Sequence, residues 1–332
     1  MTVNIINGQP WRQQYAFNTA QTGDITGWTT STSLPATIFD SQAIVTVNRV
    51  YLFGGFAHKN VYTAPIDSSG VVGAWSSGTA LPANVFYSQS IVTKSRVYLL
   101  GGTSSATIYT ATFDSSGNIG TWGAAGSLPG VKSTGQAIVT KNRVYIIGGN
   151  SADVYTAPIG DDGIIGTWST ESSIVGAKTQ GQAVLTKNRV YFIGGSTSAS
   201  VYTAPVSEEG IIGTWSSTTS LPEYVYNSQA VVTRGRIYLL GGAVGIQYSP
   251  KVYTAPIDSD GIIGTWALGT ALPYAVTDSQ VVTTSSRVYL FGNSQNAAIY
   301  QAPFAGGSND SDHSWEVPIF WTNFHGQTEI LA

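Results

Sequence analysis

The sequence predicts an all-β fold, a seven-bladed β-propeller of four-stranded antiparallel blades. Three recurring features predict it. A tryptophan recurs at nearly constant spacing, at Trp28, Trp75, Trp122, Trp168, Trp215, Trp266 and Trp315. An apolar stretch ending in Gly-Gly recurs with the same period, as in "NRVYLFGG" and "NRVYIIGG". A glutamine precedes each of these stretches, at Gln42, Gln89, Gln136, Gln182, Gln229 and Gln280. Self-similarity with this period indicates one supersecondary unit per repeat.

Each repeat contains the sequence of four strands. Strand a is "SQAIVT", strand b "RVYLFGG", strand c "NVYTAPI", and strand d runs from near "GTW" toward "LP". In strand b, Val50 and Leu52 point to one face, while Tyr51 and Phe53 point to the other. Both faces are apolar, so the sheet should be covered on both sides. A four-stranded sheet of this kind, repeated around an axis, is a propeller blade.

The two chain ends are expected to complete the ring. The stretch "TVNIING" near the N-terminus has the pattern of strand b, and "GQTEILA" at the C-terminus has the pattern of strand a. We therefore expect residues 326–332 to join residues 1–35 as the seventh blade, with blades one to six across 36–325. The chain would form one domain, 1–332. Pairing the ends in one sheet would leave no free sheet edge.

The composition excludes several classes of function. The chain has no cysteine, which excludes disulfides, thiolate metal sites and cysteine nucleophiles. A net charge of −3 argues against a nucleic-acid partner. No apolar run approaches the ~18 residues of a membrane span, so membrane insertion is not expected. Residues 1–20 show no signal peptide.

The repeat resembles that of the kelch family. The double glycine Gly54-Gly55, followed by Tyr62 and Trp75, carries the resemblance, which covers essentially the whole chain. It implies a propeller, a fold shared by enzymes, lectins and adaptors. Stretches such as "VYTAPIDSSGVVGAW" are also similar to repeats of phage virion and bacterial surface proteins. That similarity implies a virion or extracellular location, with the cytoplasm as the alternative.

Strand order assigns the connections to two faces. The a–b and c–d turns share one face, and they vary little between repeats. The a–b turns hold ten of the fifteen Lys and Arg, and the c–d turns with Asp24 hold nine of the eighteen acids. These turns are either solvated hairpin tips with compensating charge or a docking face for other virion or surface proteins.

The b–c loops and d–a linkers share the other face, and their sequences vary. Variable loops on a fixed scaffold indicate a recognition surface, although drift would give the same variation. Exposed aromatics among short polar side chains suit sugar binding, but Trp11 and Trp321 could instead plug the seam. The candidate binding residues are Trp11, Arg12, Asp40, His58, Tyr87, Tyr224, Tyr226, Asn227, Tyr248, Asp278, Trp321 and His325.

The sequence contains no recognisable catalytic motif. His58, His313 and His325 lack metal-ligand spacing, so no metal and no cofactor is expected, although the acidic stretch at 309–314 leaves a metal site open. Asp40, Asp278 and Glu223 could form a carboxylate pair, so an enzyme with an axial pocket is the least favoured hypothesis. We expect a non-catalytic binding or structural module that recognises a glycan or protein receptor. A kelch-like protein–protein interaction scaffold is the alternative.

Overall fold

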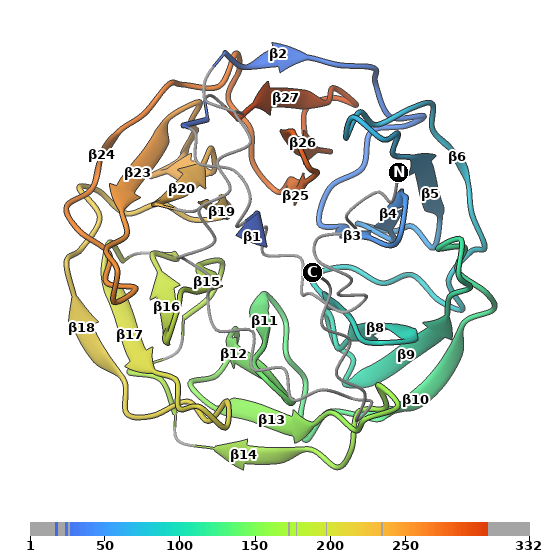
Figure 1. The fold of residues 1–332 in the computed structure, drawn as a ribbon, viewed down its shortest axis with the longest axis horizontal. Helices are drawn as coiled ribbons and strands as arrows, with labels where there is room; N and C mark the ends of the chain where they lie inside the picture. The colour runs from blue at the N-terminus through green and yellow to red at the C-terminus, as the bar shows by residue number, and fades with distance from the viewer. Residues whose placement is uncertain are drawn as a thin grey trace, which may run out of the picture.

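The protein is a ring of antiparallel β-sheets (Figure 1). The computed structural model describes residues 17–18, 24–25, 27–171, 173–176, 178–196, 198–233 and 235–304. All regular elements within these ranges are strands. The described part of the chain contains no helix that is long and apolar enough to cross a membrane. The predicted all-β propeller with four-stranded antiparallel blades is thereby confirmed.

Each sheet runs from an innermost strand a near the axis to an outermost strand d at the rim (Figure 1). The first contains β3 (Gln42–Val45), β4 (Arg49–Phe53), β5 (Val61–Pro65) and β6 (Ser76–Ser77). The second contains β7 (Gln89–Val92), β8 (Arg96–Leu100), β9 (Thr107–Thr112) and β10 (Gly123–Ser127). The third contains β11 (Gly135–Val139), β12 (Arg143–Gly148), β13 (Val154–Pro158) and β14 (Ser169–Glu171).

The other three sheets repeat this order. The fourth contains β15 (Gln182–Leu185), β16 (Arg189–Ile193), β17 (Val201–Pro205) and β18 (Ser216–Thr218). The fifth contains β19 (Gln229–Thr233), β20 (Arg236–Leu240), β23 (Val252–Pro256) and β24 (Ala267–Leu268), with β1 (Phe17–Asn18) parallel to β19. Its b–c loop forms a hairpin of β21 (Ala243–Val244) and β22 (Gln247–Tyr248). The sixth contains β25 (Gln280–Thr283), β26 (Arg287–Phe291), β27 (Tyr300–Pro303) and β2 (Thr29–Thr30).

The described residues form six blades, not the predicted seven. Strand β2 pairs with β27 as the outer strand of the sixth sheet, with Thr30 opposite Tyr300, and Ile25 bridges to Phe304. Trp28, which directly precedes β2, therefore belongs to the sixth sheet, where strand c comes from near the C-terminus and strand d from near the N-terminus. Strand β25 of the sixth sheet also contacts β3 of the first. The expected pairing of residues 326–332 with 2–8 lies outside the described residues.

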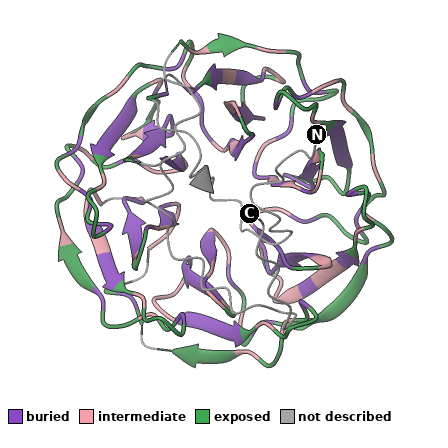
Figure 2. Ribbon diagram, viewed as in Figure 1, coloured by how far each residue is buried: buried purple, intermediate pink, exposed green. Residues whose placement is uncertain are grey.

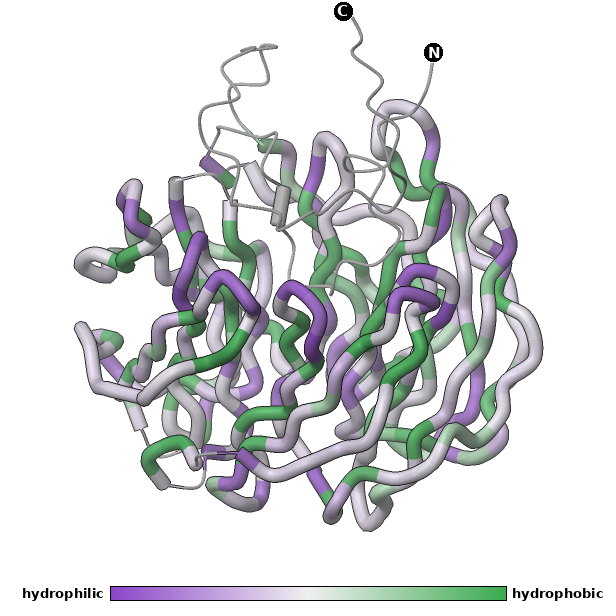
Figure 3. The backbone as a smooth tube through the Cα atoms, turned by 60° about the horizontal axis from the view of Figure 1, so that its bottom comes forward, coloured by the Kyte–Doolittle hydropathy of each residue, from purple (hydrophilic) through white to green (hydrophobic). Residues whose placement is uncertain are grey.

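The hydrophobic core is divided among the interfaces between neighbouring sheets. One cluster joins Tyr51 and Phe53 of the first sheet to Leu99 and Trp122 of the second. An equivalent cluster joins the sixth sheet to the first. Buried residues concentrate on the inner strands, while the outer strands are exposed (Figure 2). Hydrophobic segments run through the body of the molecule, and several loops at its surface are hydrophilic (Figure 3).

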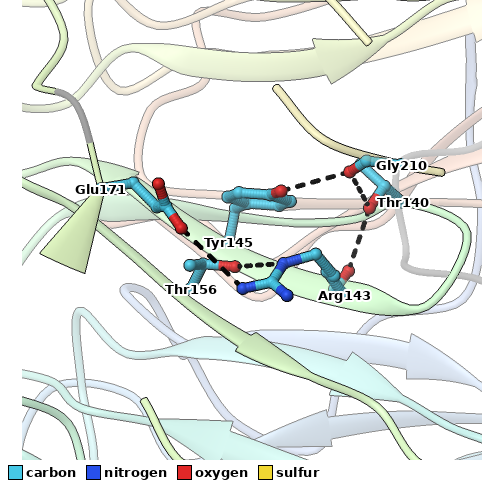
Figure 4. Close-up of polar contacts among 6 residues, drawn as sticks. All are labelled: Thr140, Arg143, Tyr145, Thr156, Glu171 and Gly210. Carbon is cyan, nitrogen blue, oxygen red and sulfur yellow. Dashed lines mark hydrogen bonds and ion pairs between the residues drawn. The ribbon is translucent and has the colours of Figure 1, made fainter. Parts of the chain in front are cut away.

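Tyrosines of strand b hold each sheet to the next one. The Tyr145 hydroxyl donates to the carbonyl oxygen of Gly210, at 3.2 Å, and the Thr140 hydroxyl donates to the same oxygen at 2.8 Å (Figure 4). Gly210 lies in the c–d turn of the next sheet. Tyr289 of the sixth sheet makes the corresponding bond to Gly70 of the first, at 3.4 Å. In this repeated bond the hydroxyl of a buried tyrosine donates to a carbonyl in a turn of the next sheet, which satisfies its hydrogen-bonding group.

Four arginines of the a–b turns donate to a threonine of strand c in their own sheet. Arg143 donates through Nε to the Thr156 hydroxyl at 3.2 Å and lies 3.9 Å from Glu171 (Figure 4). The expected pairing of basic and acidic turns occurs between Arg236 and Asp24, at 3.6 Å. A partly exposed pair of this kind contributes only about 0–1 kcal/mol to stability.

We predict that Tyr145→Phe lowers the free energy of unfolding by about 1 kcal/mol, because it removes one hydrogen bond to the turn. Thr140→Val should have a similar effect. The double variant should lose more than the sum, since the Gly210 carbonyl then lacks both donors. Urea denaturation of the two single variants and the double variant measures this. Strict additivity would show that the two hydroxyls do not share the carbonyl.

Candidate functional site

A depression lies on the axis where the six innermost strands begin, on the face of the d–a linkers. Its volume is ≈ 60 Å³, which gives room for roughly four waters. Each sheet contributes the glutamine that begins strand a and the residues before it. The lining residues are Asp40, Ser41, Gln42, Tyr87, Ser88, Gln89, Thr134, Gln136, Gln180, Gly181, Gln182, Asn227, Ser228, Gln229, Asp278, Ser279 and Gln280.

Six of these residues form what we call the axial ring, one from each sheet. All six have a left-handed backbone, with φ values of 54° at Asp40, 53° at Tyr87, 57° at Thr134, 60° at Gln180, 53° at Asn227 and 56° at Asp278. Aspartate and asparagine tolerate this conformation, whereas a β-branched residue such as Thr134 strongly disfavours it. The same strained conformation at six equivalent positions therefore has a structural cause.

Backbone hydrogen bonds around the axis supply that cause. The amide of Asp40 donates to the carbonyl of Asp278 at 3.2 Å, and the amide of Tyr87 donates to Asp40 at 3.4 Å. The amide of Thr134 in turn donates to the carbonyl of Tyr87, at 3.3 Å. In the other direction around the axis, the amide of Asp278 donates to the carbonyl of Asn227, also at 3.3 Å. In five of the six positions the left-handed turn directs the amide to the carbonyl of the neighbouring sheet, so the strain there is offset by satisfied backbone groups.

The repeated glutamine has a structural role between the sheets. The side chain of Gln42 donates to the Ser41 carbonyl at 2.8 Å and accepts from the Ser90 amide of the next sheet at 3.1 Å. Gln89 accepts from the Ala137 amide in the same way, at 3.2 Å. Both ends of the Gln42 amide are therefore used within the scaffold. The variable residues of the axial ring line the depression.

Two acids of the axial ring are brought together. Burial and the negative charge of Asp278 raise the pKa of Asp40 to about 7, while a hydrogen bond from Tyr87 lowers it. Burial also raises the pKa of Asp278. Burial and the charge of Asp40 raise the pKa of Tyr87 above its usual range, so its hydroxyl stays protonated. Among the described residues, no group of three or more His, Cys, Asp or Glu gathers as a metal site would require.

A cluster of aromatic rings adjoins the axial ring. Phe39 and Phe56 stack with their centroids 5.5 Å apart, and Phe86 meets Phe56 edge-on at 5.3 Å. The ring centroid of Tyr87 lies 5.5 Å from that of Phe86. We call Phe39, Phe56, Phe86 and Tyr87 the aromatic shelf. Phe56 is 50% exposed, so the shelf offers an apolar surface beside the polar depression.

The three phenylalanines were not among the predicted site residues. Phe39 and Phe56 meet because the amide of Phe56 donates to the carbonyl of Phe39, at 3.0 Å. The residue after the double glycine pairs in this way with the residue before the axial ring. The equivalent pair in the second sheet is Thr103 and Phe86, at 3.1 Å. Aligning the repeats shows that both positions are aromatic only in the first sheet, but it does not show that the two residues are in contact.

The other predicted residues that the structure describes do not line the depression. Tyr224 and Tyr248 are exposed near the β21–β22 hairpin, and the Tyr226 hydroxyl donates to the Gly245 carbonyl at 2.7 Å. His58 is exposed in the first b–c loop. Glu223 pairs with Lys251 at 2.6 Å rather than with the axial acids. Trp11, Arg12, Trp321 and His325 lie outside the described residues.

Sequence reasoning also missed a buried lysine on this face. Lys132 is 2% exposed and occupies the linker position that Val85 holds in another repeat. Its ammonium group donates to the Asp153 carbonyl at 2.6 Å and to the Ser151 hydroxyl at 2.8 Å, and lies 4.8 Å from the Tyr155 ring centroid. Burial lowers the pKa of Lys132 to about 8. This cation is thus bound by its own loop and is not part of the depression.

The sequence matches no family model and no curated protein. Solved structures match by fold. The structure of YjhT is similar, with a TM-score of 0.65 over 80% of this chain and 94% of that chain, at 12% sequence identity. At that identity, the similarity shows the propeller fold alone.

We predict that Thr134→Asn raises the free energy of unfolding by about 1 kcal/mol, because asparagine tolerates the left-handed conformation and threonine does not. The reciprocal change, Asn227→Thr, should lower the free energy of unfolding by a similar amount. Thermal and urea denaturation of both variants measure the effect. If both changes destabilise the protein, the ring residues are fixed by side-chain contacts rather than by backbone preference.

Proposed function

We propose that the protein is a non-catalytic binding module that recognises a glycan through the variable face, with the axial depression as its centre. The observation that carries the proposal is the axial ring. Six equivalent backbone positions hold two carboxylates, two amides, a hydroxyl and a phenol. Such groups donate and accept the hydrogen bonds that sugar hydroxyls require, and the aromatic shelf suits the apolar face of a pyranose.

Binding rather than catalysis fits the size of the depression. Room for roughly four waters accommodates one substituent of a sugar, while the ring of the sugar would lie against the shelf and the loops. Thr134 keeps a left-handed backbone that a threonine disfavours, which supports the view that the residue at this position is selected for a function other than stability. The similarity of the repeats to those of phage virion and bacterial surface proteins supports a location on a virion or outside the cell.

A glycan array probed with the purified protein tests this proposal. We expect a defined set of glycans to bind, and Asn227→Ala or Phe56→Ala to weaken binding by about tenfold or more, equivalent to about 1.4 kcal/mol. Ser259→Ala, in a c–d turn on the opposite face, is the matched control and should bind normally. Failure to bind any glycan at any density would refute the proposal.

A protein–protein interaction scaffold is the second candidate, favoured by one observation on the opposite face. Exposed apolar residues directly follow the c–d turn glycine in four sheets, namely Val71, Ile164, Ile211 and Ile262. Recurring apolar side chains beside charged turns suit a protein partner. In that case, replacing Ile164, Ile211 and Ile262 with serine should abolish complex formation with the partner, while the Asn227→Ala variant should retain it.

A further inference from the structure

The described lining of the axial depression carries negative charge without a basic counterpart. Asp40 and Asp278 are the only charged residues in this described lining, and they are adjacent in the backbone ring. Tyr87, the third titratable group of the lining, hydrogen-bonds to Asp40 and stays neutral. Two carboxylates removed from water repel each other, and a cation placed between them would relieve that repulsion.

Three lysines in the described loops of this face are bound elsewhere and do not supply that cation. Lys132 is bound to its own loop carbonyls, and Lys178 lies over the ring of Tyr202 with 4.8 Å to the centroid. Lys251 pairs with Glu223. None of the three belongs to the lining of the depression, and neither does Lys59 of the first b–c loop. Among the described lining residues, no lysine or arginine therefore neutralises the acid pair.

The aromatic shelf points to an organic cation. Tyr87 of the shelf lines the depression, and Phe86 lies against it with 5.5 Å between ring centroids, so the shelf adjoins the depression at Tyr87. Faces of aromatic rings attract an ammonium group, and aromatic residues combined with carboxylates recognise alkylammonium ligands. A hydrated metal ion would gain nothing from Phe56, and the described residues offer it only two acid ligands.

A buried hydroxyl in the wall of the depression is also unsatisfied. Ser41 lines the depression between Asp40 and Gln42 and is 1% exposed. Within the described part of the chain, its Oγ has no hydrogen-bond partner. A buried polar atom without a partner is unusual in a folded protein. This oxygen is not exposed to the depression, so the Ser41 side chain would have to rotate for it to reach a ligand there.

We propose that the depression receives a positively charged ammonium group of the ligand, held between Asp40 and Asp278 with the aromatic shelf beside it. This inference rests on the proposed function, because it names the part of the ligand that enters the axial site. It predicts selection for amine-bearing ligands over neutral and anionic ones of the same shape. The same geometry makes Asp40, Asp278 and Phe56 the residues that determine specificity.

Choline and its uncharged carbon isostere, 3,3-dimethylbutan-1-ol, provide a matched pair of probes. Ligand-observed NMR titration of the full chain at about pH 8, where Asp40 is ionised, should give a Kd for choline at least about tenfold lower than for the alcohol. Ethanolamine in parallel distinguishes a primary ammonium group from a methylated one. Asp40→Asn and Asp278→Asn should each weaken choline binding by about tenfold, and Phe56→Ala by a smaller factor.

Asp260→Asn is the control variant, because it removes the same charge from a c–d turn on the opposite face and should leave choline binding unchanged. The inference is overturned if the alcohol binds as tightly as choline, if neither ammonium probe binds at tens of millimolar, or if the Asp40 and Asp278 variants keep the affinity. Neutral glycans on the array are an independent readout. Their binding, with no preference for ammonium, would leave the proposed function standing and remove this inference alone.

Discussion

Replacing Trp122 with alanine is expected to lower the free energy of unfolding by about 3–5 kcal/mol. Trp122 is 7% exposed and packs edge-on against Phe53 of the preceding sheet, with 5.3 Å between ring centroids. Its removal empties the centre of the cluster that joins the first two sheets. The surrounding strands are fixed by hydrogen bonds on both sides and cannot collapse into that space, so the cavity persists.

Urea denaturation followed by circular dichroism measures this loss. Trp168→Ala is the matched control, because Trp168 occupies the same repeat position but is only partly buried against its cluster. We expect a clearly smaller loss for Trp168→Ala. Equal losses in the two variants would show that burial at the sheet interface does not determine the contribution of the repeated tryptophan.

The strands could be predicted from the sequence because each repeat has a strong periodic pattern. Gln42–Val45 and Arg49–Phe53 form the expected innermost hairpin. The number of blades could not be predicted in the same way. A repeat count does not distinguish a unit that forms its own blade from one that completes another. Trp28 was assigned to a seventh blade, whereas the pairing of β2 with β27 places it in the sixth.

The candidate site was only partly predictable for a related reason. Comparing equivalent linker positions between repeats singled out Asp40, Tyr87, Asn227 and Asp278, and the structure brings these four together around the axis. The aromatic shelf depends on a contact between two loops of one sheet, Phe39 with Phe56. That contact follows from a backbone hydrogen bond that sequence periodicity does not reveal.

Asp40→Asn is expected to raise the free energy of unfolding at about pH 8, by at most about 4 kcal/mol. Burial and Asp278 raise the pKa of Asp40 from 3.8 to about 7 in the folded protein. Between these values the folded protein keeps a proton that the unfolded chain has released, so stability falls as the pH rises from about 4 to about 7. Asparagine cannot ionise, and it tolerates the left-handed backbone at this position.

The gain from Asp40→Asn should therefore vanish below about pH 4, where both states of the wild type are protonated. Thermal denaturation across this pH range measures it, and parallel curves for variant and wild type would contradict the raised pKa. Asp67→Asn is a control in which the expected change in the free energy of unfolding has the opposite sign. Hydrogen bonds from Ser69 and Val71 lower the pKa of Asp67, so that variant should lose stability at neutral pH and approach the wild type in acid.

A stabilising Asp40→Asn variant would also connect stability with binding. The wild-type protein retains two mutually repelling acids at a position where asparagine would be more stable, and Asn227 shows that the same ring accepts an amide. A destabilising arrangement is retained where function requires it. If Asp40→Asn gains stability at pH 8 and loses choline binding together, the acid pair is maintained for a ligand. A gain in stability with unchanged binding would leave the acid pair without a role.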